Sequence, residues 1–135
     1  MTFREVELTL PNGFHDVYIT AINFDVIART VALSLSVDIS DADQGEPKYR
    51  SGRLTASDVE LFFIEPPEAT YPHRLAGEGM SATGDYQLSG LESKVEQLIT
   101  RLDDETDRYR FFLNDWNSFI YIAANGVVFD WVTSS

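Results

Sequence analysis

The chain has 135 residues, 44% of them hydrophobic and 13% aromatic, which is enough to bury the core of one domain spanning residues 1–135. It carries 10 Lys and Arg against 22 Asp and Glu, a formal net charge of −12. This charge repels phosphate backbones and anionic membranes, so we expect no nucleic-acid or membrane partner. The chain contains no cysteine, which excludes disulfides and thiolate chemistry.

The same charge excess has two interpretations. It keeps a protein soluble, and it attracts a basic protein partner by electrostatic steering. The opening MTFREVELTL has acidic residues where a signal peptide carries a basic region and then an apolar run. No stretch has the length of apolar residues that a membrane-spanning helix needs. We therefore expect a cytoplasmic protein.

The first third of the chain predicts three strands. Alternation of Val6, Leu8 and Leu10 with polar residues predicts a strand over 5–10, which the turn residues 11–13 end. The next strand, from Phe14, changes its apolar phase, and a β-bulge near Ala21 would restore the pattern. The most regular alternation follows at residues 31–39 and predicts a strand with one buried face that forms a hairpin with the strand before it.

The middle of the chain alternates between loops and strands. Residues 41–47 are acidic and contain Gly and Pro, which predicts a loop. A strand is predicted over 52–65, broken by a bulge or corner at Ser57-Asp58 and ended by two prolines. Residues 68–90 predict mostly loop, with a short strand over 82–88. Apolar residues at helical spacing then predict one helix near 91–102.

The C-terminal third predicts further strands over 111–113 and 116–124, and a last strand from Val127 that forms a hairpin with the strand before it. Asn125-Gly126 predicts a type I′ turn, because both residues accept the positive φ that this turn requires. Such a turn would pair Ala124 with Val127 and give the hairpin one wholly apolar face. Together these elements predict a mainly β (α+β) fold, either a bent antiparallel sheet or a two-layer β-sandwich, with one helix near 91–102.

His15 and Asp16 are the first candidate site. Two histidines, His15 and His73, with nearby carboxylates have the donors of a zinc or manganese site, although their spacing matches no motif. The interpretation that we favour is structural: polar side chains at a turn bond backbone groups, so His15 or Asp16 should lock the turn at Asn12-Gly13.

Two further segments carry polar residues of interest. Asp41, Asp43 and Gly45 have superficial calcium-ligand spacing, but the sixth and twelfth positions of an EF-hand loop would hold Glu46 and Gly52, so the motif fails. Asp115, Trp116 and Asn117 interrupt two apolar strands. Trp116 either caps the core, which we favour, or offers its ring to a ligand.

No serine-nucleophile elbow and no phosphate-binding glycine loop is present, so the sequence assigns no catalytic residue, metal ligand or cofactor. The patches Asn12–Asp16, Phe62–Pro67 and Asp115–Tyr121 resemble a group of small uncharacterised bacterial proteins. The His-Asp opening before a strand is also similar to that of some immunity proteins of bacterial polymorphic toxin systems. That resemblance implies a small, acidic, cytoplasmic protein that works by binding.

Three functional hypotheses follow. The first is a non-enzymatic binding protein, of immunity-inhibitor type, that presents acidic segments 41–46 and 103–107 to a basic protein. Its binding residues would be His15, Asp16, Asp115, Trp116 and Asn117. The second is a metal-dependent hydrolase that uses His15 and Asp16, with His73 or Asp115. The third is a β domain that binds a small ligand in an aromatic pocket lined by Trp116, Tyr121 and Trp131.

Overall fold

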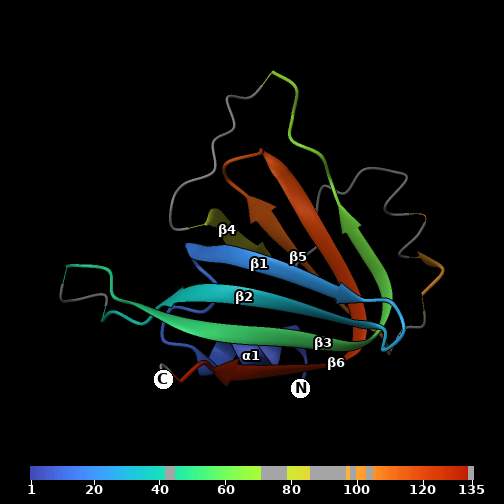
Figure 1. Ribbon diagram of the computed structural model, residues 1–135, viewed down its shortest axis with the longest axis horizontal. Helices are drawn as coiled ribbons and strands as arrows, with labels where there is room; N and C mark the ends of the chain where they lie inside the picture. Colours follow the sequence, from blue (N-terminus) through green and yellow to red (C-terminus); the bar gives the residue numbers. More distant parts are fainter. Residues whose placement is uncertain (42–44, 71–78, 86–96, 98–99, 103–104, 134–135) are drawn as a thin grey trace.

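The computed structural model describes residues 1–41, 45–70, 79–85, 97, 100–102 and 105–133. Its six strands form one antiparallel sheet that closes into a barrel in the order β1-β2-β3-β6-β5-β4, and a short helix packs against it (Figure 1). The elements are α1 (Phe3–Thr9), β1 (Val17–Asp25), β2 (Thr30–Asp38), β3 (Tyr49–Ile64), β4 (Met80–Asp85), β5 (Asp107–Leu113) and β6 (Ser118–Trp131).

The predicted mainly β class and the antiparallel sheet are confirmed, and the sheet closes on itself. Closure comes from the first residues of β1, where Val17 pairs with Ala82 and Ile19 pairs with Met80 of β4. The rest of β1 pairs with β2 alone. Because the first and last strands of the sheet bond to each other, the barrel has no open edge along this seam.

The predicted central strand is confirmed as β2. Its inward residues Val31, Leu33, Leu35 and Val37 are at most 1% exposed, and the residues between them are half-buried on the outer face. β2 pairs with β1 on one side and with β3 on the other. This alternation therefore identified a strand that is buried on one face and fully paired.

Both predicted bulge positions are also irregular in the structure. The β1–β2 register shifts between Ile19 and Ala21, which restores the inward phase of β1. In β3, Asp58 has a φ of 50°, and the register with β6 shifts just beyond it, between Val59 and Leu61. Bulges of this kind let long strands bend around a closed barrel.

The strand predicted over 5–10 is wrong, because Phe3–Thr9 is the helix α1. The Thr2 side chain accepts a hydrogen bond from the Glu5 amide at 3.1 Å and caps the helix, in the Thr-x-x-Glu sequence that is typical of a helix start. Phe3 and Val6 lie on the buried face, whereas Leu8 is 68% exposed. The apolar alternation was therefore coincidental, and helical spacing determines which side chains the core receives.

The hairpin turn predicted at Asn125-Gly126 is also wrong, because both residues lie inside the continuous strand β6. Ala124 pairs with Val59 and Gly126 pairs with Ser57 of β3, so β3 supplies the partner that the predicted hairpin would have supplied. The residues of β6 that face the core change at this point. They are even-numbered up to Ala124 and odd-numbered from Val127. The bulge at Asp58 on β3 lies opposite this change.

One hydrophobic cluster joins α1 and all six strands inside the barrel. Its aromatic centre is formed by Phe3, Phe14, Tyr109 and Phe111. Phe3 and Tyr109 stack with ring centroids 5.0 Å apart, and Phe14 contacts the rings of Tyr109 and Phe111 edge-on. The helix predicted near 91–102 lies largely outside the described residues, as do residues 86–88 of the predicted strand over 82–88.

Candidate functional site

His15 and Asp16 lie in the turn that leads into β1, and their side chains contact each other. Nε2 of His15 is 3.1 Å from Oδ2 of Asp16, and the two side chains are 72% and 56% exposed. Asp16 adopts a φ of 54°, an irregular backbone that brings neighbouring side chains together. The pair is thus joined and solvent-exposed.

The predicted role of this pair as the turn lock is wrong, since neither side chain bonds backbone within the described part of the chain. Asn12 performs that role. Its Nδ2 donates to the carbonyl oxygens of Asp38 at 3.1 Å and Ser40 at 2.9 Å. Asn12 therefore ties the N-terminal turn to the end of β2, and the His15-Asp16 pair is left facing solvent.

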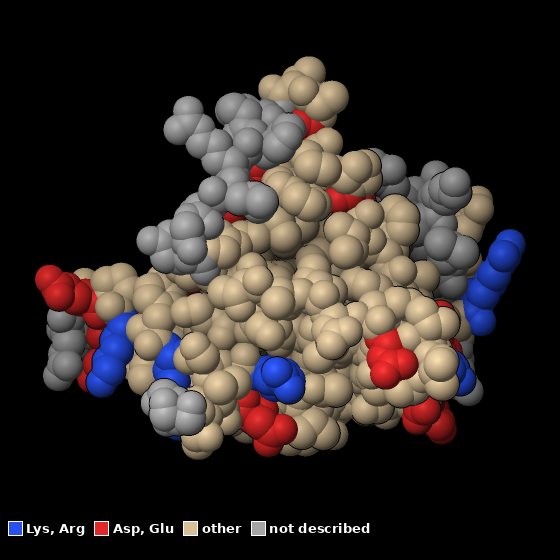
Figure 2. Space-filling view, viewed as in Figure 1, with Lys and Arg blue, Asp and Glu red and all other residues tan. Residues whose placement is uncertain are grey.

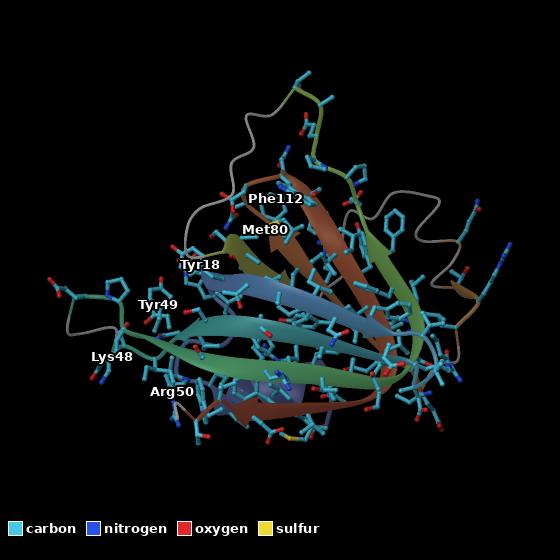
Figure 3. All side chains as sticks on the ribbon, in the orientation of Figure 1. Tyr18, Lys48, Tyr49, Arg50, Met80 and Phe112 are labelled. Carbon is cyan, nitrogen blue, oxygen red and sulfur yellow. The ribbon has the colours of Figure 1, made fainter. Side chains whose placement is uncertain are left out.

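Tyr18 and Tyr49 lie at one end of the barrel (Figure 3), and Tyr18 follows Asp16 by two residues along the chain. Tyr18 of β1 and Tyr49 of β3 meet edge-on, with ring centroids 5.4 Å apart. Strand register explains the meeting: Tyr18 pairs with Ser36 of β2, and Tyr49 pairs with Asp38 two residues further along. The two rings thus meet across β2.

Electrostatic interactions link Tyr49 and Asp38 to the residues around them. The pKa of the Tyr49 phenol is raised by burial of the group and then by the nearby Tyr18, Asp38 and Asp16. The pKa of Asp38 is lowered, first by a hydrogen bond from the Ser40 side chain and also by His15. We call His15, Asp16, Tyr18, Asp38 and Tyr49 the tyrosine cluster.

The tyrosine cluster is flanked by a surface groove of about 500 Å³ that the sequence did not predict. Arg50 lies in it, with Cζ 4.6 Å from the centroid of the Trp131 ring. The groove lies between the start of β3 and the chain that follows β6, which a hydrogen bond from the Val132 amide to the Ser51 carbonyl holds in place. Its lining residues are Tyr49, Arg50, Ser51, Val132 and Thr133.

The second predicted group, Asp115, Trp116 and Asn117, connects parts of the barrel. Oδ2 of Asp115 accepts a 2.8 Å hydrogen bond from the Ser81 amide, which joins the β5–β6 turn to β4. Trp116 packs against the core, as the favoured interpretation predicts. Asn117 has a φ of 49°, and its amide bonds Glu68. These contacts are structural, although Asn117 also lines a groove of about 430 Å³ with Phe63 and residues 65–68.

The aromatic residues of the small-ligand hypothesis do not converge on one pocket. Tyr121 lies on the outer face of β6, with its ring near Phe63 and Phe119. Trp131 instead contacts Arg50 and Phe129 near the end of β6. The described inward side chains of the strands pack into one hydrophobic cluster inside the barrel.

Asp107 belongs to the acidic segment 103–107 that the first hypothesis presents to a basic protein, but it contacts the helix α1. Asp107 is half-buried, and its Oδ2 accepts a 2.6 Å hydrogen bond from the Phe3 amide at the start of α1. Burial raises the pKa of Asp107, and the Phe3 amide opposes that shift. Asp107 therefore anchors the helix, whereas Glu105, Asp41 and Glu46 are exposed.

Within the described ranges, no three His, Cys, Asp or Glu side chains are grouped so as to hold a metal ion. His73, the second histidine of the metal hypothesis, lies outside the described residues. Among the residues whose structure is described, no helix has the length and apolar character that crossing a membrane requires.

Acidic and basic side chains both appear around the lower part of the face shown in Figure 2. Acidic residues stand at the left tip, where the β2–β3 connection extends in Figure 1, and Lys and Arg lie beside them along the lower margin. Lys48, Tyr49 and Arg50 occupy this end in Figure 3.

Searches of protein-family models, curated proteins and solved structures each found no match to the chain.

Proposed function

We propose that this protein is a non-enzymatic binding protein and that the tyrosine cluster is its contact surface for a basic protein partner. The observation that carries the proposal is the edge-on pair of Tyr18 and Tyr49, which stands at one end of the barrel beside Asp16 and Asp38. Tyr49 is 40% exposed, so its ring is available to a second molecule.

The chemistry of this surface suits a cationic side chain. A Lys or Arg side chain gains from the face of an aromatic ring and from a nearby carboxylate at the same time. Tyrosine is also enriched among the residues that dominate protein interfaces, because it buries a large area and loses little conformational entropy. The net charge of −12 would add long-range attraction of a basic partner.

The described inward side chains pack as one hydrophobic cluster, which supports binding at the surface over capture of a small molecule inside the barrel. The immunity-type inhibitor is the more specific form of the proposal, with a cytoplasmic toxin domain as the basic partner. A toxin gene beside this gene in the genome is the observation that would support that form.

The experiment is a pull-down from the native host with the tagged protein at low and high salt. The variants Tyr49→Ala and Asp16→Asn each remove one element of the tyrosine cluster. Their controls lie at the other end of the barrel. Phe24→Ala removes a 47% exposed ring of β1, the strand that carries Tyr18, and Asp58→Asn removes an exposed carboxylate of β3, the strand that carries Tyr49. Asn accepts the positive φ of position 58.

We expect one basic protein to be retained at low salt and lost at high salt, because exposed charges are screened within about 10 Å at 0.1 M salt. Tyr49→Ala and Asp16→Asn should reduce its retention, whereas the two controls should retain it. If the same protein is retained by all five forms, the tyrosine cluster is not the contact surface. If no protein is retained at low salt, the basic-partner proposal fails.

A further inference from the structure

The groove beside the tyrosine cluster contains a guanidinium that is positioned but has no hydrogen-bond acceptor within the described residues. The Trp131 ring supports the Arg50 guanidinium from one face. No hydrogen bond or ion pair joins Arg50 to another described residue. Its N–H groups, which point outward in the plane of the guanidinium, are therefore available to a ligand in the groove.

Packing against Trp131 makes this arginine different from a mobile surface arginine. Val37, opposite Arg50 in the β2–β3 ladder, is fully buried, and Trp131 packs against the hydrophobic core. Arg50 thus extends from the inner face of β3 at the mouth of the barrel. A guanidinium that is already held over a ring loses less side-chain entropy when it binds an acceptor.

The rest of the groove lining is suited to an anion. Tyr49, Ser51 and Thr133 contribute hydroxyl groups, Val132 contributes an apolar wall, and none of the lining residues carries a carboxylate. The pKa of Tyr49 is raised, so its phenol keeps the proton that it can donate. The planar guanidinium of Arg50 is the positive group of this lining, and its fork of N–H donors matches a planar, two-oxygen acceptor.

We propose that this groove is a carboxylate-binding site in which Arg50 makes the paired contact and Trp131 positions Arg50. A carboxylate fits better than a phosphate, because its two oxygens match the planar fork with a single negative charge. A phosphate brings more charge toward Asp16 and Asp38, which lie close to Tyr49. The site goes beyond the proposed basic-partner surface and does not depend on it.

Three sources share this chemistry: the C-terminal carboxylate of a peptide chain, an acidic side chain of a protein, and a free small acid. N-acetylglycine represents the first, N-acetylaspartic acid N-methylamide the second and acetate the third. N-acetylglycinamide is the neutral control for the first, and inorganic phosphate tests the competing anion. All are titrated at constant ionic strength, so that screening does not change during the titration.

The measurement is a ¹H–¹⁵N NMR titration that follows the Trp131 indole N–H and the Arg50 Nε–H signals. We expect saturable shifts of both signals with at least one of the three carboxylates and none with N-acetylglycinamide, and the carboxylate that binds most tightly identifies the source. Shifts of equal size with the neutral amide, tighter binding of phosphate than of every carboxylate, or no saturable shift with any carboxylate would overturn the proposal.

Variants of Arg50 and Arg53 distinguish the paired contact of the Arg50 guanidinium from the effect of positive charge alone. Arg50→Gln should weaken carboxylate binding about tenfold or more, the loss expected when a paired charged contact is removed. Arg50→Lys keeps the charge but lacks the planar fork, and it should restore only part of the affinity. The matched control is Arg53→Gln on the same strand, at an exposed position outside the groove, which should change the affinity by less than about twofold.

Because Arg50 and Arg53 are both exposed, each variant should keep the dispersed spectrum of the folded protein. If Arg50→Gln and Arg53→Gln weaken binding equally, the carboxylate responds to overall charge and the groove is not its site. This result would leave the pull-down experiment unaffected, since the latter depends on Asp16 and the Tyr49 ring.

Discussion

The phenol of Tyr109 donates a 2.5 Å hydrogen bond to Oε2 of Glu7, and this contact joins the helix α1 to the barrel strand β5. Tyr109 is 1% exposed and stacks on Phe3, so its ring and its hydroxyl both hold the helix. Glu7 in turn forms a 2.8 Å ion pair with Arg4 on the same helix. The docking of α1 therefore depends on a polar contact inside an aromatic cluster.

Tyr109→Phe should lower the free energy of unfolding by about 1–3 kcal/mol, because Glu7 loses its donor in a partly buried site. Chemical denaturation measures this change. Tyr49→Phe is the control, since it removes a hydroxyl from a ring that is 40% exposed, and its effect should be within about 0.5 kcal/mol. Equal losses in the two variants would contradict the role of the Glu7 contact.

Gly84→Ala should destabilise the protein, because a Cβ at this position would lie 2.2 Å from the Tyr109 hydroxyl oxygen. The ring cannot move cheaply, since Phe3 stacks on it and Glu7 holds its hydroxyl. We expect a loss of about 1–3 kcal/mol in denaturation experiments, the usual cost of overpacking a core.

Gly126→Ala is the matched control and also tests the continuity of β6. No atom lies within 4 Å of the position of the new Cβ, and Gly126 does not have a positive φ. The substitution should leave stability unchanged or raise it by up to about 1 kcal/mol, because Ala restricts the unfolded chain. A loss as large as that of Gly84→Ala would instead indicate a turn at Asn125-Gly126.

Asn12→Ala should lower the free energy of unfolding by about 1–2 kcal/mol, since its side-chain amide bonds the carbonyl oxygens of Asp38 and Ser40. His15→Ala should leave the denaturation midpoint unchanged within error, because the His15-Asp16 pair is exposed. Thermal and chemical denaturation of the two variants compare these roles directly. A larger loss for His15→Ala would show that His15 is the turn lock after all.

Asp107→Asn should change how stability depends on pH. Because burial raises the pKa of Asp107, the folded state holds this proton more tightly than the unfolded state. The protonated Asp107 therefore contributes fully to stability below the pKa that it has in the unfolded state. This contribution is lost as pH rises through its pKa in the folded state. Asn removes this loss but keeps an oxygen that can accept from the Phe3 amide, so the variant should gain stability relative to the wild type as pH rises from acidic to neutral.

Asp38→Asn should change the pH dependence of stability in the opposite direction, measured in the same denaturation experiments. The pKa of Asp38 is lowered, so its contribution to stability is present above the unfolded pKa and is lost as pH falls through the folded pKa. This variant should therefore lose stability relative to the wild type as pH rises through the acidic range. If the two variants shift in the same direction, the assigned environments of Asp107 and Asp38 are wrong.

Local patterns predicted much of the sheet because they depend on neighbours in the chain. The alternation at residues 31–39 identified β2, and the phase change near Ala21 identified a true irregularity, because a strand with one buried face must keep a period of two. The same rule failed at residues 5–10, where only a short alternation was available. The capping residues Thr2 and Glu5 were the signal that would have identified the helix.

The candidate site could be predicted only in part. His15 and Asp16 were selected from the sequence, and they lie in the tyrosine cluster. Tyr18, Tyr49 and Arg50 were not selected, because no spacing along the chain relates them. Strand register across β2 brings the two tyrosines together, and the pairing of Gly52 with Trp131 brings Arg50 beside that ring.

The sequence by itself determined the mainly β class, the acidic surface and the strand β2, since composition and alternation act locally. Only the tertiary structure decided that the sheet closes through β1 and β4, and that Asn125-Gly126 continues a strand. Asn125 and Gly126 favour a turn locally, but they continue the strand because the long neighbouring strand β3 pairs with β6 on both sides of them. The tyrosine cluster and the Arg50 groove exist for the same reason, because long-range pairing, and not proximity in the chain, places their residues side by side.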